Sequence, residues 1–106
     1  MSDDHGAPAY SVVVADPAAD VLRHLVKGKK ADPVRARKVA KTLRQLARDP
    51  SYPGLHTHRY PGLDGVWEEQ IWQSYVENNT PAAWRIWWFY GPTEGTITVI
   101  DLGPHP

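Results

Sequence analysis

One arginine stands in the middle of the most apolar stretch of this 106-residue chain. Arg85 belongs to the run Trp-Arg-Ile-Trp-Trp-Phe-Tyr at residues 84–90, whose aromatic and aliphatic side chains are typical of a buried strand. Burying a guanidinium is unfavourable unless a negative group meets it. The position of Arg85 therefore indicates either an internal carboxylate or a groove that binds a phosphate.

The chain also contains imidazoles that could complete a phosphate site. Metal-independent cleavage of a phosphodiester needs a base for the 2′-hydroxyl, an acid for the leaving oxygen and a cation for the pentavalent phosphorus. His58, His105 and Arg85 are of these chemical types, and Arg59 is a second cation. Each histidine could instead hold a turn or satisfy a polar group of the core. Spacing alone does not show whether the three side chains converge.

His56 and His58 alternate along one extended segment, which would place both imidazoles on the same side. With His105 nearby they could bind a metal, and that is the alternative interpretation of this group. No acidic residue lies at a recognisable ligand spacing beside them, so we predict neither a metal nor a cofactor. His56 and Arg59 are assigned to substrate binding.

Helices on one side of a sheet leave its second face free, yet both phases of the strand at 84–90 are aromatic, which is more apolar surface than a water-facing sheet normally shows. Such a face could belong to a thick core plus a protein interface, or it could be a platform on which Trp87 stacks a base beside Arg85. Glu68 would share this face, where it either neutralises Arg85 or acts as a base. If Trp67 and Ile71 of the predicted strand face the helices, Glu69 points inward, toward a basic residue of the second helix.

Charge is unevenly distributed along a chain whose formal net charge is zero. Residues 21–59 contain eleven Lys or Arg and two Asp, a net charge of +9, while the segments on either side are acidic. There is no cysteine, no stretch approaches the length of a membrane span, and the N-terminus does not resemble a secretion signal. We expect a cytoplasmic protein with a basic face, no membrane association and no small-molecule ligand.

The pattern of apolar residues and breakers predicts one α+β domain at 9–106 after a flexible tail at 1–8. Asp-Pro pairs at 16–17 and 32–33 begin two helices, which end near Gly28 and at Arg48. The predicted strands are 10–15, 66–76, 82–90 and 96–102, with a strand-like segment at 55–60. The β-α-α-β-β-β order predicts a two-helix hairpin packed on one face of a small, mainly antiparallel sheet.

This order of elements resembles the RelE/ParE superfamily of bacterial toxins, and several short motifs do so as well. They are Gly65-Val66-Trp67-Glu68, Trp84-Arg85-Ile86 and Thr96-Ile97-Thr98-Val99-Ile100, together with Pro53-Gly54-Leu55 through His58, Asn79-Thr80-Pro81 and Pro104-His105-Pro106. The resemblance extends over about residues 10–106 and is closest to RelE-like and HigB-like toxins.

The resemblance implies a toxin that inhibits translation by cutting mRNA in the ribosomal A site and is restrained by a cognate antitoxin. Arg85 matches the strand arginine that contacts the scissile phosphate in such nucleases. His58 lies in the loop that supplies an acid–base or basic residue in the HigB-like and YoeB-like members. His105 occupies the C-terminal position where those toxins have a histidine, tyrosine or arginine. The alternative is a non-nucleolytic ParE-like or degenerate binding protein on the same fold. Glu68, Glu69 and the zero net charge favour that alternative.

Overall fold

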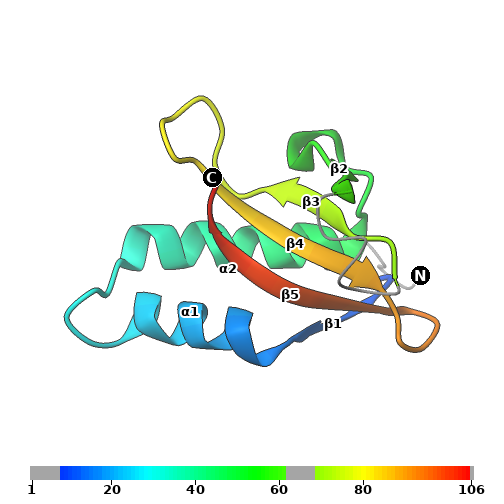
Figure 1. The fold of residues 1–106 in the computed structure, drawn as a ribbon, viewed down its shortest axis with the longest axis horizontal. Helices are drawn as coiled ribbons and strands as arrows, with labels where there is room; N and C mark the ends of the chain where they lie inside the picture. The colour runs from blue at the N-terminus through cyan, green and yellow to red at the C-terminus, as the bar shows by residue number, and fades with distance from the viewer. Residues whose placement is uncertain (1–7, 62–68, 106) are drawn as a thin grey trace, which may run out of the picture.

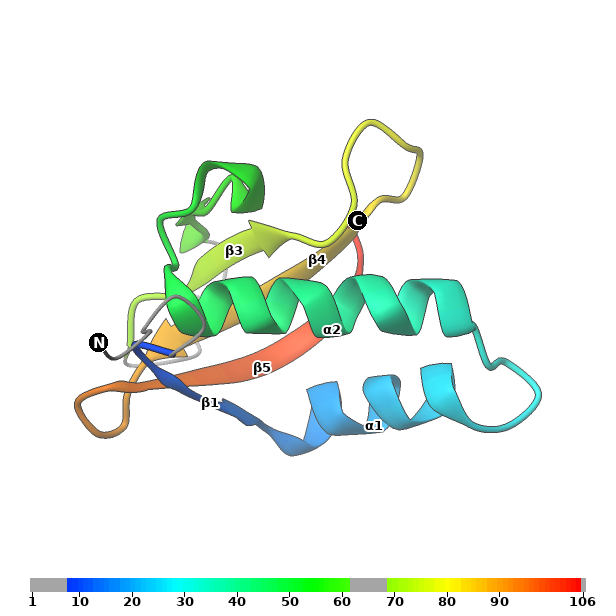
Figure 2. The same cartoon turned by 180° about the vertical axis from the view of Figure 1, so that it is seen from behind.

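The structure is a computed structural model and describes residues 8–61 and 69–105. Within these residues, a five-stranded sheet has the order β1-β5-β4-β3-β2. Only β1 runs parallel to its neighbour, β5; the other pairs are antiparallel. Figure 1 shows the sheet in front of the two helices, and Figure 2 shows the helices in front of the sheet. The strands are β1 (Ser11–Val14), β2 (His58–Arg59), β3 (Trp72–Tyr75), β4 (Trp84–Tyr90) and β5 (Thr96–Pro104).

These findings confirm the predicted α+β class, the order of the elements and the position of both helices on one face. The strand-like segment at 55–60 becomes a 3-10 turn, η1 (Pro53–Leu55), followed by the short edge strand β2. Residues 1–7 of the predicted tail lie outside the described part of the chain. Neither helix in that part is long and apolar enough to span a membrane.

The helices begin where the Asp-Pro pairs predict. Helix α2 (Pro33–Arg48) has the predicted bounds, and the Asp32 carboxylate accepts the Arg35 N–H at 3.1 Å as an N-cap. Helix α1 (Asp16–Val26) begins at Asp16 itself, so Ala15 is its N-cap and supplies no side-chain hydrogen bond. Both helices bury one stripe of apolar residues, which accounts for their stability in the fold.

The main core lies between the helices and the sheet. Trp88 in β4 is fully buried there, and its ring stacks on Trp72 of β3 with the ring centroids 6.2 Å apart. The other buried members of this core are Ala18, Leu25, Val39, Leu46, Leu55, Ile86, Ile97, Val99 and Leu102. This apolar layer fixes the position of β3 and β4, the strands that hold the candidate site.

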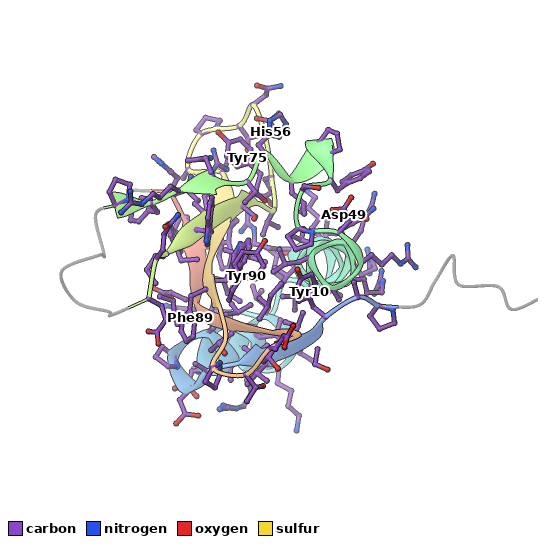
Figure 3. All side chains as sticks on the ribbon, turned by 90° about the vertical axis from the view of Figure 1, so that its right-hand side faces the viewer. Tyr10, Asp49, His56, Tyr75, Phe89 and Tyr90 are labelled. Carbon is purple, nitrogen blue, oxygen red and sulfur yellow. The ribbon has the colours of Figure 1, made fainter. Side chains whose placement is uncertain are left out.

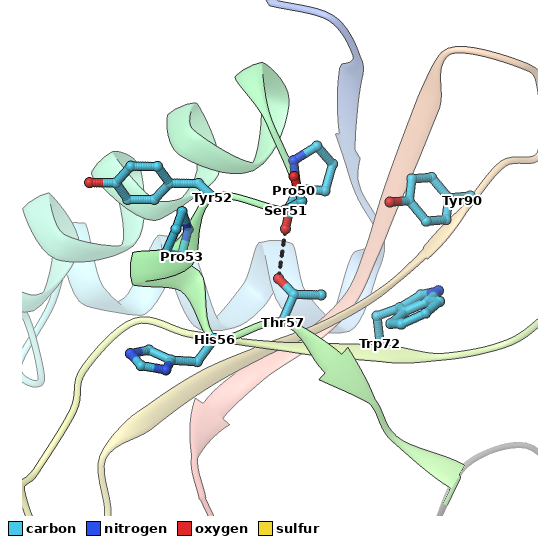
Figure 4. A pocket seen from close by; sticks show the side chains of 8 residues that line it. All are labelled: Pro50, Ser51, Tyr52, Pro53, His56, Thr57, Trp72 and Tyr90. Carbon is cyan, nitrogen blue, oxygen red and sulfur yellow. Dashed lines mark hydrogen bonds between the residues drawn. The ribbon is translucent and has the colours of Figure 1, made fainter.

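A chain of hydrogen bonds on the helix-covered face ties the segment at 50–57 to the sheet. The Trp88 indole N–H donates to Ser74 Oγ at 2.8 Å, and Ser74 Oγ lies 2.7 Å from Thr57 Oγ1. Thr57 in turn donates to the Pro50 carbonyl oxygen at 2.9 Å (Figure 4). These bonds satisfy buried polar groups and set the path of the chain toward β2.

The prediction for the strand at 66–76 is wrong in two respects. The described part of this region is a strand only from Trp72, and its two faces are exchanged relative to the prediction. Trp72 and Ser74 face the helices, whereas Ile71 belongs to a second cluster on the other face. Glu69 is exposed rather than directed inward. Trp72 and Ile71 are both large and apolar, so hydrophobicity alone could not assign the faces.

Candidate active site

Arg85 is buried in β4, with 9% of its surface exposed. Its guanidinium carbon lies 3.5 Å from the centroid of the Tyr75 ring. Nη1 donates to the carbonyl oxygens of Glu77 at 2.8 Å and Trp84 at 3.2 Å, while the buried Nε–H has no hydrogen-bond partner. Among the described residues no carboxylate forms an ion pair with Arg85. The guanidinium is therefore held by dipoles and a ring face, and its charge is not neutralised there.

Tyr75 is the residue around which the predicted site residues gather. The His56 ring lies 4.8 Å from the Tyr75 ring at an interplanar angle of 31°, and the His58 ring meets it edge-on at 6.1 Å. His56 and Tyr75 lie next to each other in Figure 3. Arg85 approaches Tyr75 from the neighbouring strand. Arg85 and His56 therefore lie on opposite faces of the Tyr75 ring, so Tyr75 stands between the cation and this imidazole.

Sequence reasoning assigned no role to Tyr75. Its only signal was the alternation that places residues 73 and 75 on one face of a strand, and the predicted phase of that strand was wrong.

Both ring nitrogens of His58 are occupied. Nδ1 lies 2.8 Å from the His56 carbonyl oxygen, and Nε2 lies 3.1 Å from Nε2 of Gln73. Gln73 is buried and uses its Oε1 to accept the Trp87 indole N–H at 3.1 Å. His58 is exposed but held in place, and Gln73 and Trp87 are the residues that hold it.

The expectation of an open aromatic platform on this face is wrong. Trp87 and Phe89 are each 7% exposed, and with Ile71 and Ile100 they form a second buried cluster. The Tyr60 ring packs edge-on against Trp87 at 5.9 Å. Trp87 therefore has no free ring face for a base, and its N–H supports the site through Gln73. Aromatic residues in both phases of β4 indicate a sheet that is buried on both faces.

His105 lies on the other side of Arg85. It follows β5 directly, is exposed, and its backbone N–H donates to the Ala83 carbonyl oxygen at 2.9 Å. Gly103 pairs with Arg85 in the ladder, and a Cβ added to Gly103 would meet no atom within 4 Å. The ladder position beside Arg85 on β5 therefore carries no side chain. The strand register separates the Cα atoms of His58 and His105 by about 19 Å, so these two imidazoles do not touch.

The remaining predicted residues lie at the margin of this group. Arg59 is exposed on the edge strand β2, opposite Trp72 in the ladder, and strand alternation directs it to the face opposite His58. Glu68 lies outside the described residues. No three His, Cys, Asp or Glu side chains gather into a metal-binding group in the part of the chain that is described.

Sequence reasoning also missed Glu77, the acid that meets the basic face of α2. Its carboxylate lies 3.1 Å from Arg35 Nε and 3.4 Å from Lys38 Nζ, and it accepts the Trp84 N–H at 3.1 Å. Burial of Glu77 opposes its ionisation, but the Arg35 hydrogen bond, the Trp84 N–H and the two positive charges outweigh it and lower the pKa of Glu77. The sequence pattern predicts Glu69 for this role, whereas the structure has Glu77 there.

Two hollows adjoin the site. One, of about 480 Å³, runs between α2 and β3, with Tyr75 and Glu77 on one wall and Lys38 and Lys41 on the other. The second, of about 390 Å³, includes His56 and is shown in Figure 4. Its other lining residues are Pro50, Ser51, Tyr52, Pro53, Thr57, Trp72 and Tyr90. The basic wall of the first hollow continues the positive charge of Arg85 toward α2.

Three solved structures are similar to this chain over most of its length. The YoeB/ParE toxin from Agrobacterium tumefaciens matches with a TM-score of 0.66 at 12% identity, covering 91% of this chain and 99% of that one. The RelE of the archaeal RelE-RelB complex from Pyrococcus horikoshii matches with a TM-score of 0.61 at 12% identity. The match covers 91% of this chain and 94% of that one. The YoeB dimer from Staphylococcus aureus matches with a TM-score of 0.62 at 9% identity. The match covers 92% of this chain and 99% of that one.

No family model and no curated protein matches this sequence. The similarity therefore lies in the arrangement of the helices and strands, which extends over nearly the whole of each matched chain. It confirms, at the level of the fold, the resemblance noted from the sequence motifs. The chain has the fold of the RelE and YoeB/ParE toxins.

Proposed function

We propose that this protein is a RelE-like toxin that inhibits translation by cutting mRNA on the ribosome without a metal ion. The observation that carries the proposal is Arg85, a buried guanidinium that no carboxylate among the described residues neutralises and that lies across the Tyr75 ring from His56 on a toxin fold. A scissile phosphate supplies the negative charge that this position lacks.

The chemistry follows from the three kinds of side chain. Arg85 binds the phosphate and stabilises the charge that grows on its oxygens as the 2′-oxygen attacks phosphorus and the bond to the 5′-oxygen breaks. One imidazole takes the proton of the 2′-hydroxyl, and another gives a proton to the leaving 5′-oxygen. His56 and His58 stand on the Tyr75 side of Arg85 and His105 on the Gly103 side, so the two protons are handled on opposite sides of the phosphate.

We also propose a cognate antitoxin as the protein partner, in the cytoplasm where ribosomes and mRNA are found. The archaeal RelE neighbour was solved as a RelE-RelB complex. In this chain, exposed valines lie on β1, at the end of α1 and at the start of α2: Val13 is 50% exposed, Val26 65% and Val34 55%. A bound peptide would remove this apolar surface from water.

Expression in growing bacteria tests the proposal. Induction should stop growth, and mapping of transcript ends should reveal new cuts that depend on translation. Continued growth, or growth arrest without such cuts, would contradict it. The neighbouring gene is a second test, because a small reading frame for an antitoxin should adjoin this one.

A non-nucleolytic binding protein on the same fold is the second candidate. The zero net charge favours it, since the ribosome is a polyanion. The double variant His58→Ala/His105→Ala separates the two candidates: toxicity that persists in this variant supports a binding mechanism, and its loss supports RNA cleavage.

A further inference from the structure

The amide of Gln73 has a defined orientation. The Trp87 indole nitrogen can only donate a hydrogen bond, so the atom 3.1 Å away must be the Gln73 oxygen. The amide nitrogen of Gln73 then faces His58 Nε2 at 3.1 Å. Because an amide NH₂ can only donate, His58 Nε2 must accept.

The acceptor role of Nε2 determines where the proton of His58 lies. A neutral imidazole with a lone pair on Nε2 has its proton on Nδ1, and Nδ1 lies 2.8 Å from the His56 carbonyl oxygen, which can only accept. Each donor in the series Trp87, Gln73, His58 therefore meets an acceptor. Reversing any one bond would place two donors or two acceptors face to face.

We infer that Gln73, oriented by Trp87, is a positioning residue that fixes His58 in the Nδ1–H tautomer. His56 is then the imidazole that exchanges protons with the substrate on this side of Arg85. The role of His56 rests on the proposed function, whereas the tautomer of His58 does not depend on it. It deepens that function by assigning different tasks to two neighbouring histidines.

The surroundings of His56 fit this task. The side chain is exposed, its ring lies against Tyr75, and its ring nitrogens have no hydrogen-bond partner among the described residues. The backbone of His56 has a φ of +49°, the left-handed conformation that side chains other than glycine seldom adopt. His58 uses the carbonyl of this same residue, so its tautomer also holds the His56 backbone in place.

The helix-covered face provides an internal comparison. There Trp88, Ser74 and Thr57 form a similar series that ends on a backbone carbonyl, and none of its members titrates near neutral pH. Both series anchor the segment at 50–58 to the sheet through a tryptophan of β4. Only the series on the Arg85 face includes an imidazole.

Nitrogen-15 NMR of the histidine rings tests the tautomer directly in the full-length chain. We expect His58 to show a protonated Nδ1 and an unprotonated Nε2. Gln73→Glu should add a proton to Nε2 while Nδ1 keeps its own, because the carboxylate accepts from both Trp87 and His58 and the His56 carbonyl oxygen still requires a donor. Gln70→Glu, the same change at an exposed position, should leave the spectrum of His58 unaltered. A wild-type His58 protonated on Nε2, or equal spectra for the two variants, would overturn the inference.

Trp87→Phe is the second variant if Gln73→Glu does not fold. It removes the donor that orients Gln73 and should give a mixture of the two His58 tautomers. A single, unchanged Nδ1–H tautomer in this variant would show that Gln73 needs no orientation by Trp87 and would overturn that part of the inference.

Cleavage assays on programmed ribosomes test the division of tasks. His56→Ala should slow cleavage by about 10²-fold or more, the usual cost of losing an acid–base group, and His58→Ala by roughly tenfold through lost positioning. A reversed order would overturn the role of His56. If the wild-type chain cuts no RNA, the proposed function fails and the role of His56 with it, while the spectra still decide the tautomer.

Discussion

Two partly or fully buried arginines, Arg35 and Arg85, lie on opposite faces of the sheet and are satisfied in different ways. Arg35 has 32% of its side chain exposed, forms ion pairs with Glu77 and Asp32, and stacks over the Trp84 ring with its guanidinium carbon 4.8 Å from the centroid. Arg85 is 9% exposed and, within residues 8–61 and 69–105, meets only carbonyl oxygens and the Tyr75 ring. Both contact residue 77, Arg35 through its carboxylate and Arg85 through its backbone.

The difference distinguishes a structural arginine from a candidate binding arginine. Removing a charge from water costs several kcal/mol even after relaxation, and a carboxylate partner offsets that cost for Arg35. Two carbonyl bonds and a ring face offset part of it for Arg85 and leave the buried Nε–H without a hydrogen-bond partner among the described residues. An incoming anion would supply the remainder. We therefore expect substitutions at Arg85 to affect activity and substitutions around Arg35 to affect stability.

The largest effect is expected from Arg85→Ala compared with Arg35→Ala. Loss of a charge-stabilising group in the transition state lowers rates by about 10²–10³-fold, so Arg85→Ala should abolish growth arrest on induction. Arg35→Ala should keep the arrest. Thermal unfolding of both variants is the control: a folded, inactive Arg85→Ala supports the account, and an unfolded one would assign Arg85 to structure.

Glu77→Ala should be the most destabilising change in the Arg35 cluster. The side chain is 8% exposed and meets Arg35, Lys38 and the Trp84 N–H, so its loss removes one of the two carboxylates that pair with Arg35 and leaves the Trp84 N–H without its acceptor. We expect the free energy of unfolding to fall by about 2–3 kcal/mol. Urea denaturation measures this, with Glu94→Ala in the exposed 91–95 turn as the matched control. Equal stability of the two variants would contradict the account of Glu77.

Asp32 permits a finer separation, because it both caps α2 and pairs with Arg35 at 3.3 Å. Asp32→Ala loses both contacts and should cost about 1 kcal/mol. Asp32→Asn keeps the cap and loses only the ion pair, which at this exposure is worth less than about 1 kcal/mol. If Asp32→Asn is as unstable as Asp32→Ala, the ion pair rather than the cap stabilises this end of the helix.

The smallest expected effect is a dependence of stability on pH that comes from Glu77. Its pKa in the folded protein is below its ordinary value of 4.5, so the unfolded chain binds the proton more readily. The stabilisation is complete above about pH 4.5 and is lost as the pH falls through the lower folded pKa. Glu77→Gln should flatten this part of the acid unfolding curve, and an unchanged curve would contradict the assignment.

The sequence was informative where local chemistry determines the structure. Asp32-Pro33 predicted the start of α2 because both the cap and the proline act within one turn. Arg85 stood out because a lone cation among aromatic residues requires a partner. Breakers and aromatic runs likewise predicted β4, β5 and the connection between them.

Contacts between distant segments were not predictable in the same way. Tyr75 and Glu77 become important through residues seven or more positions away, such as Trp84, Arg85 and Arg35. The phase of β3 is set by the stacking of Trp72 on Trp88, and alternation gave no preference between its two apolar faces. The orientation of Gln73 likewise depends on Trp87, which the sequence placed on an open platform.

Cleavage by the purified protein on ribosomes programmed with one defined mRNA tests the role of Arg85 most directly. The wild-type chain should cut within the A-site codon. Arg85→Ala should cut at least about 10²-fold more slowly, at an unchanged melting temperature. An Arg85→Ala variant that cuts as fast as the wild type, or a wild type that leaves the mRNA intact, would contradict the claim that this guanidinium binds the scissile phosphate.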